Sequence, residues 1–183
     1  MTFVAAGGER VACEPPFPPL PSEVRGSRSG FDPAPLLDHV GRARTVGVLL
    51  VRLGGHAAGV FEGERLVDSK VGSRLVHGRH RKGGSSSGRF ARRREGQARA
   101  ALQQAADVAA RVLEPWLNRL DAVVLGGDRR ALDAVLADPR LAPLRPLAVD
   151  RIYDVPDPRL AVLRAMPDRF LATIVLPSGR ITP

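Results

Sequence analysis

Hydrophobic positions in the first half of the chain predict three strands in succession. Residues 45–52 form a nearly continuous apolar run, the pattern of a central strand that is buried on both faces. Gly54-Gly55 and Gly63-Glu64 are turn signals that separate this run from strand-like stretches at 57–61 and 65–71. The short turns predict an antiparallel meander, and a last short strand is expected at 74–77.

Beyond residue 87 the apolar period changes from two to 3.6, which predicts a long helix over about 88–117. The apolar stripe of this helix contains Ala98, Leu102, Ala105, Ala109, Val112, Leu113 and Trp116. The polar residues that lie mostly opposite are Arg99, Gln103, Asp107 and Arg111. One face of the helix is therefore expected to pack on the sheet.

The C-terminal part alternates between short strands and helices. The pattern predicts strands at 121–125 and 146–149, helical segments at 130–137 and 159–164, and a strand or helix–strand piece at 169–176. Gly126-Gly127 is expected to turn, with Asp128 as the N-cap of the helix that follows. A meander followed by helix, strand, helix and strand predicts an α/β (α+β) fold, a mixed sheet with packed helices, as in ribonuclease H-like domains.

The N-terminal segment is rich in proline. Five prolines between residues 15 and 21 exclude a helix or a central strand there. We expect residues 1–30 to be a flexible, extended or disordered segment, and a short helix at 36–41. Residues 31–183 then form one domain.

Charge is concentrated in one stretch of the chain. The net charge is +9, and between Arg74 and Arg99 nine Lys/Arg face one acid, Glu95, a local excess of +8. Such a footprint favours a polyanionic partner, and no basic amphipathic anchor helix points to a membrane. The sequence shows no apolar run of transmembrane length and no signal peptide, and its single Cys13 excludes an internal disulfide. These features predict a cytoplasmic protein that binds nucleic acid.

A glycine–serine loop at 78–88 lies inside this basic stretch. Residues 83–88 read Gly-Gly-Ser-Ser-Ser-Gly, and arginines flank them on both sides. The loop leads directly into the long helix, whose N-terminus offers free backbone N–H groups to an anion. A plain flexible linker needs neither the arginines nor this position.

The string Val-Gly-Ser-Arg-Leu-Val-His-Gly-Arg-His-Arg-Lys-Gly-Gly at 71–84, followed by Arg-Phe-Ala-Arg-Arg-Arg at 89–94, resembles a known family. It is similar to the catalytic middle domain of archaeal and eukaryotic class I peptide-chain release factors. It is more similar still to the Vms-type release-factor-like domain in its actinobacterial branch. Residues 51–61 and Leu-Gly-Gly-Asp at 125–128 fit the same domain, and the resemblance covers about residues 43–176.

The resemblance implies a release-factor-like peptidyl-tRNA hydrolase that cleaves the peptide–tRNA ester on stalled large ribosomal subunits, in ribosome rescue and quality control. It implies a loop that enters the peptidyl transferase centre, with no cofactor and no metal. The catalytic residues it implies are Gly83, Gly84, Ser85, Ser86 and Ser87. Ribosomal RNA and peptidyl-tRNA would be bound by Arg74, Arg79, His80, Arg81, Lys82, Arg89, Arg92, Arg93 and Arg94. The protein is expected to be a monomer that acts without a domain that reads stop codons.

The chain departs from the family at one position. The loop lacks the glutamine that follows the small residues in the family, and the nearest one, Gln97, is expected on the helix surface. Ser85, or in the Vms-type alignment Ser86 or Ser87, stands in its place. A catalytically inactive ribosome- or tRNA-binding module is therefore the alternative function.

Three other chemistries fit the sequence less well. His77 and His80 lack a third ligand nearby, and the surrounding arginines would repel a metal cation. A serine nucleophile at 85–87 would depend on His80 as its base. Asp121, Asp128, Asp150 and Asp154 could serve a two-metal nuclease, although Asp128 fits a helix cap and the last two fit turns.

Overall fold

The computed structural model describes residues 1–20, 26, 29–52, 54–73 and 87–178, with the backbone alone at 87–94 and 177–178. The chain folds into two compact units. The larger unit is Arg44–Met166, and the smaller one combines Met1–Ala43 with Pro167–Pro183.

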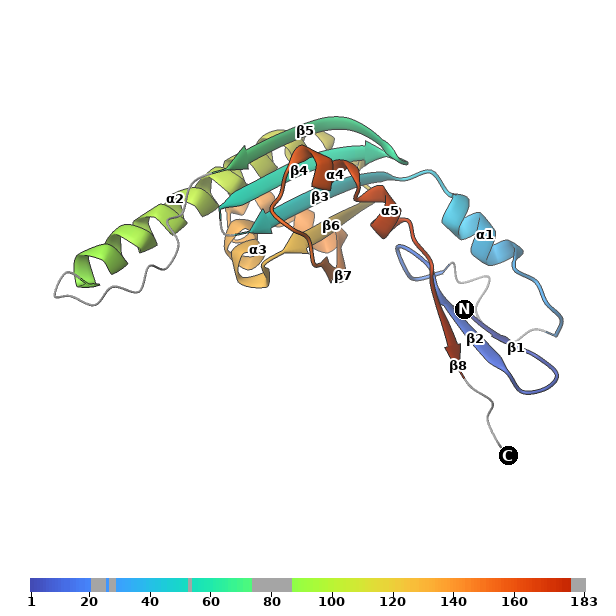
Figure 1. The fold of residues 1–183 in the computed structure, drawn as a ribbon. Helices are drawn as coiled ribbons and strands as arrows, with labels where there is room; N and C mark the ends of the chain where they lie inside the picture. Colours follow the sequence, from blue (N-terminus) through green and yellow to red (C-terminus); the bar gives the residue numbers. More distant parts are fainter. Residues whose placement is uncertain (21–25, 27–28, 53, 74–86, 179–183) are drawn as a thin grey trace. The chain divides into compact units, whose positions relative to one another are not determined.

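A five-stranded mixed sheet forms the larger unit, with the strand order β5-β4-β3-β6-β7 (Figure 1). The strands are β3 (Thr45–Arg52), β4 (Gly55–Glu62), β5 (Arg65–Ser73), β6 (Ala122–Gly127) and β7 (Ala148–Tyr153). β3, β4 and β5 are an antiparallel meander, and β3, β6 and β7 run parallel. The predicted meander and the predicted mixed α/β sheet are confirmed. The central position of β3 explains why its residues are apolar on both faces.

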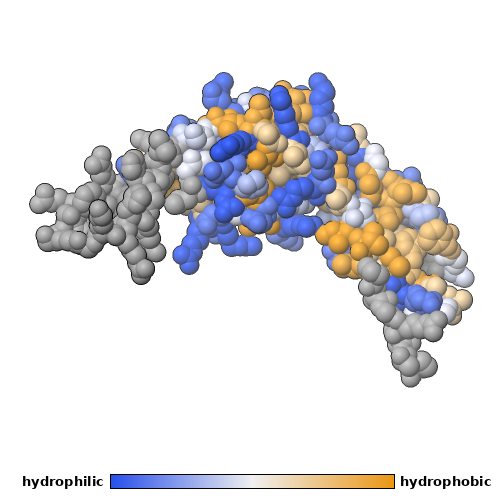
Figure 2. All heavy atoms as spheres, viewed as in Figure 1, coloured by the Kyte–Doolittle hydropathy of each residue, from blue (hydrophilic) through white to orange (hydrophobic). Residues whose placement is uncertain are grey.

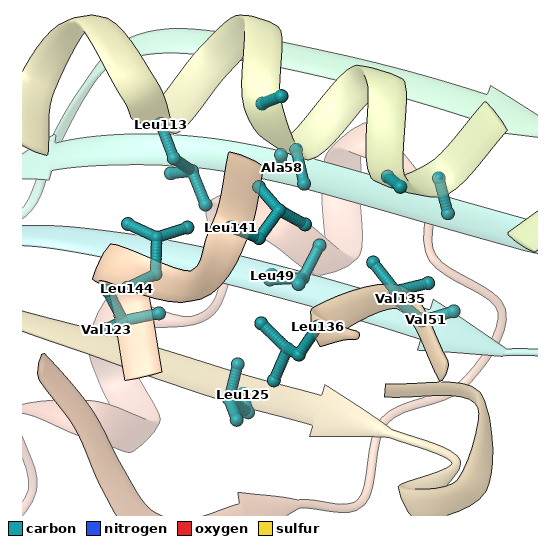
Figure 3. Packing of buried hydrophobic residues seen from close by; sticks show 14 of the residues in the cluster. Leu49, Val51, Ala58, Leu113, Val123, Leu125, Val135, Leu136, Leu141 and Leu144 are labelled. Atoms are coloured by element: carbon teal, nitrogen blue, oxygen red, sulfur yellow. The ribbon is translucent and has the colours of Figure 1, made fainter. Parts of the chain in front are cut away.

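Helices cover both faces of this sheet. The helical segments are α2 (Ser87–Leu113), a 3-10 helix (Glu114–Arg119), α3 (Arg129–Leu136), a second 3-10 helix (Pro139–Leu147) and α4 (Leu160–Arg164). α2 and α3 share one hydrophobic core with Leu49, Ala58 and Val123 of the sheet (Figure 3). On the opposite face, a Cβ at Gly59 would meet Leu163 of α4 at 3.0 Å.

The long helix packs through small side chains, as its pattern predicted. Ala105, Ala106, Ala109 and Ala110 are buried against the sheet, which lets the helix approach it closely. The predicted opposite side is exposed, at Arg99, Gln103, Asp107 and Arg111. An ionic contact fastens this side to the second 3-10 helix, because Arg140 lies 2.6 Å from Asp107 and 2.7 Å from Asp138.

Prolines explain two differences from the predicted elements. The α-helix ends at Leu113 rather than near residue 117, because Pro115 lacks an N–H and opens a 3-10 helix. The strand predicted at 146–149 begins only at Ala148 and continues to Tyr153, because Pro146 lies inside the second 3-10 helix. The short strand predicted at 74–77 lies outside the described residues.

The smaller unit contains a three-stranded antiparallel sheet in the order β1-β2-β8. Its elements are β1 (Thr2–Val4), β2 (Arg10–Glu14), α1 (Ala34–Gly41), α5 (Pro167–Phe170) and β8 (Ile174–Ser178). Residues 2–4 and 10–14 pair in this sheet, which the sequence did not predict. Of seven exposed large hydrophobic residues in the described part of the chain, six belong to this unit. On the face that Figure 2 shows, hydrophobic residues gather on this unit.

Candidate functional site

The glycine–serine loop joins the end of β5 to the start of α2. β5 ends at Ser73 and α2 begins at Ser87. The predicted site residues that lie outside the described residues are Arg74, Arg79, His80, Arg81, Lys82, Gly83, Gly84, Ser85 and Ser86. Four predicted RNA-binding residues lie in the first two turns of α2, namely Arg89, Arg92, Arg93 and Arg94.

The basic start of α2 extends past the sheet (Figure 1). The first turn of the helix holds no acidic residue. Gly96 has open space around it, and the closely packed part of the helix begins further along, at Ala105. The backbone of the helix segment that bears the four arginines therefore lies beyond the sheet (Figure 1).

A cavity of about 330 Å³ lies at the base of this extension. It is bounded by the end of β3, the start of β4, one stretch of α2 and the first turn of α3. Its lining residues are Val51, Arg52, Gly54, Gly55, His56, Ala98, Ala101, Leu102, Ala105, Asp128, Arg130 and Ala131. The carboxyl ends of the parallel strands β3 and β6 meet here, the edge at which open α/β sheets bind ligands.

The Gly-Gly-Asp motif at 126–128 contributes Asp128 to the lining of the cavity. Asp128 is the N-cap of α3, as predicted, since its Oδ1 accepts the N–H of Ala131 at 2.8 Å. The backbone N–H of Asp128 donates to the carbonyl of Val51 at 2.9 Å. Gly127 has φ +110°, and a Cβ there would lie 2.0 Å from the oxygen of Val51. Gly126 and Gly127 end β6 rather than forming the separate turn that was expected.

His56 is a buried residue of this region that sequence reasoning did not single out. Its side chain is 3% exposed, and its Nε2 has no hydrogen-bond partner within the described part of the chain. The ring lies over Gly72 of β5, because a Cβ at that glycine would be 2.3 Å from Nε2. Burial lowers the pKa of His56 below its usual value of 6.5, so the ring is neutral at pH 7. A histidine inside an otherwise apolar strand was the available signal.

Two arginines stand at the rim of the cavity. Arg52 donates to the carbonyl of Val155 and lies 3.4 Å from Asp154. Arg130, in the first turn of α3, is exposed, and among the described residues it forms no ion pair. Arg130 is therefore the positive charge of the rim that is exposed and left without an ion pair among the described residues.

The carboxylates considered for a nuclease have separate structural roles. Asp121 accepts the N–H of Thr45 at 2.7 Å, Asp128 caps α3, and Asp154 pairs with Arg52. Asp150 is exposed within β7, so its predicted place in a turn was wrong. Over the residues that the structure describes, no three His, Cys, Asp or Glu side chains gather where they could hold a metal. No helix in the same residues is long and apolar enough to cross a membrane.

Comparison with known proteins identifies the family. The model of the Actinobacteria/chloroflexi VLRF1 release factor matches residues 44–176. The archaeal translation termination factor aRF1 has a solved structure with 18% identity and a TM-score of 0.49, covering 76% of this chain and 39% of that one. A solved structure described as an archaeal protein has 20% identity and a TM-score of 0.45, covering 73% of this chain and 36% of that one. The chain thus spans well under half the length of these two proteins. Because the family model covers most of its residues, the chain belongs to the Actinobacteria/chloroflexi VLRF1 release factor family.

Proposed function

We propose that this protein is a release-factor-like peptidyl-tRNA hydrolase that frees the nascent peptide from stalled large ribosomal subunits. The observation that carries the proposal is the loop between β5 and α2, which places Gly-Gly-Ser-Ser-Ser before an arginine-rich helix start within the family match. A narrow site with RNA walls admits such a loop because its residues are small.

The arginines supply the docking charge in this proposal. Arg89, Arg92, Arg93 and Arg94 lie on one helix that extends past the sheet (Figure 1), and residues 74–82 add further positive charge. Guanidinium groups bind phosphate in a bidentate manner and displace counterions, so these residues would bind ribosomal RNA and the tRNA.

The chemistry is hydrolysis of the ester that joins the peptide to the tRNA ribose. Water attacks the carbonyl carbon, and the developing oxyanion accepts hydrogen bonds from backbone N–H groups of the loop at Gly83, Gly84 and Ser85. The ester C–O bond then breaks, which leaves a peptide carboxylate and a tRNA with a free ribose hydroxyl. The hydroxyl of Ser85, Ser86 or Ser87 holds the water that a glutamine side chain would otherwise position.

The test measures peptide release from purified large subunits that carry peptidyl-tRNA. Gly83→Ala combined with Gly84→Ala should slow release by more than about tenfold, because the loop can no longer adopt its backbone geometry. Gly96→Ala is the matched control, since that glycine stands in open space on α2 and should leave release unchanged. Release that survives in the double glycine variant contradicts the proposed role of the loop.

A second candidate, a ribosome-binding module without activity, is favoured by the missing glutamine. It predicts co-sedimentation with large subunits but no release by the wild type. Under both functions Arg92→Glu with Arg93→Glu abolishes co-sedimentation. The control with the same change of charge is Arg111→Glu with Arg164→Glu, which alters two exposed arginines elsewhere in the larger unit. This control variant should still co-sediment with large subunits.

A further inference from the structure

Two Gly-Gly stretches meet at the cavity, and the proposed hydrolysis uses neither. Gly54 and Gly55 line it directly, and Gly127 packs against the carbonyl of the lining residue Val51. Gly54 lies in the turn before β4, whereas Gly55, Gly126 and Gly127 belong to the sheet. The cavity is therefore a built feature of the fold with no role in release so far.

The walls of the cavity are small and apolar. Ala98, Ala101 and Ala105 on α2 and Ala131 on α3 leave space that longer side chains would fill. The volume of about 330 Å³ is near the lower end of the range for small-molecule sites. Such a space accommodates one flat, weakly polar group.

The charge at the opening of the cavity favours a ligand with a negatively charged group. Arg52 and Arg130 line the opening, but Arg52 is paired with Asp154 and the carboxylate of Asp128 caps α3. Arg130 is thus the lining cation that forms no ion pair among the described residues. His56 in the wall is neutral, so it does not cancel or add to this charge. A flat ring system that carries an anionic group matches both the walls and the rim, and a nucleotide is such a group.

We propose that the cavity binds one unpaired nucleotide of RNA, with the base between α2 and the end of β3 and its phosphate at Arg130. The choice of RNA rests on the proposed function, which makes RNA the partner. It is supported by the charge of the chain, because the local excess of +8 ends at Arg99, on the helix that walls the cavity. An aromatic side chain of a protein would fit the walls but would leave the cationic rim unused.

The test uses single-stranded RNA of about eight nucleotides with one central 2-aminopurine, whose fluorescence changes when the base leaves the stack. Ala101→Phe fills the cavity, and Arg130→Glu reverses the rim charge. The matched controls are Ala134→Phe and Arg129→Glu, exposed positions of α3 that do not line the cavity. Far-UV circular dichroism verifies that all four variants fold.

We expect the wild type to change the 2-aminopurine signal, and both cavity variants to bind the RNA about tenfold more weakly. Arg130→Glu should also lower the slope of log affinity against log salt by about one, the effect of one lost phosphate contact. The controls should stay within about twofold of the wild type. Unchanged binding and signal in both cavity variants would overturn the proposal.

Two further probes separate the sources of the ligand. In one outcome, adenosine monophosphate binds in the cavity while both cavity variants keep the wild-type affinity for the RNA. This result would overturn the RNA assignment in favour of a free nucleotide. Displacement of the RNA signal by N-acetyltryptophan amide, with no loss in Arg130→Glu, would overturn it in favour of an aromatic peptide group.

Peptide release distinguishes this inference from the function on which it rests. Normal release together with unchanged RNA binding in Ala101→Phe refutes the nucleotide site and leaves the hydrolase standing. If the wild type releases no peptide, the hydrolase is refuted. If both cavity variants at the same time lose the RNA binding that the wild type shows, the nucleotide site is supported.

Discussion

Gly127 is the position where one added methyl group should do the most damage. Its φ of +110° is a backbone conformation that side chains rarely adopt, and an added Cβ would meet the Val51 oxygen at 2.0 Å. That oxygen accepts the N–H of Asp128, which connects the ends of β3 and β6. The carbonyl has to move in Gly127→Ala, and the hydrogen bond is weakened with it.

The expected loss can be worked from these two contacts. The backbone strain costs about 1–3 kcal/mol, and the weakened hydrogen bond costs roughly another 1 kcal/mol. We therefore expect Gly127→Ala to lower the free energy of unfolding by about 2–4 kcal/mol, a large part of the total for an ordinary domain.

Two other glycines of the larger unit are internal controls. Gly63 also has a positive φ, +61°, but nothing lies within 4 Å of an added Cβ, so Gly63→Ala should cost only about 1 kcal/mol. Gly96 is helical and open, so Gly96→Ala should raise the free energy of unfolding by about 0.5–1 kcal/mol.

Urea unfolding followed by Trp116 fluorescence is the assay. Trp116 is the single tryptophan and lies in the larger unit, so its signal reports on the unit that holds all three glycines. The midpoints should rank Gly96→Ala above wild type, then Gly63→Ala, then Gly127→Ala. A Gly127→Ala midpoint at or above that of Gly63→Ala would refute the close-contact argument.

Three further predictions concern side chains. Asp128→Ala should lower the free energy of unfolding by about 1 kcal/mol in the same urea assay, because α3 loses its N-cap, whereas Asp133→Ala on the exposed side of α3 should change little. His56 has a pKa below 6.5 in the folded state, so as the pH falls the unfolded chain takes up the proton on this residue before the folded chain does. The free energy of unfolding of the larger unit should therefore decrease as the pH drops below about 6.5, and this part of the pH dependence should disappear in His56→Leu. Arg140 lowers the pKa of Asp138 to about 2, and in Arg140→Gln the pKa of that carboxyl, followed by NMR, should return toward 3.8.

Each of these has an outcome that contradicts it. Equal losses in Asp128→Ala and Asp133→Ala would mean that the cap contributes nothing. Parallel pH curves for the wild type and His56→Leu would mean that the folded state tolerates the charged ring. An Asp138 pKa that stays near 2 without Arg140 would assign the shift to another cause.

The sequence alone predicted the elements whose signals are local. The bounds of β3 came directly from its apolar run, and the packed side of α2 came from its 3.6 period. The cap at Asp128 was equally readable, since its partner lies three residues away. Charge and composition located the basic loop, because both can be read from the sequence without knowledge of tertiary contacts.

The tertiary structure decided what depends on residues far apart in the chain. β2 was unpredicted because it pairs with β8, which lies some 160 residues further along, and pairing satisfies backbone groups that no local pattern encodes. The cavity exists only because β3, β4, α2 and α3 converge, and the burial of His56 follows from the glycine on the neighbouring strand. Periodicity and capping act within a few residues and can be read in order, whereas strand pairing and cavities arise from non-local contacts that form only when the chain folds.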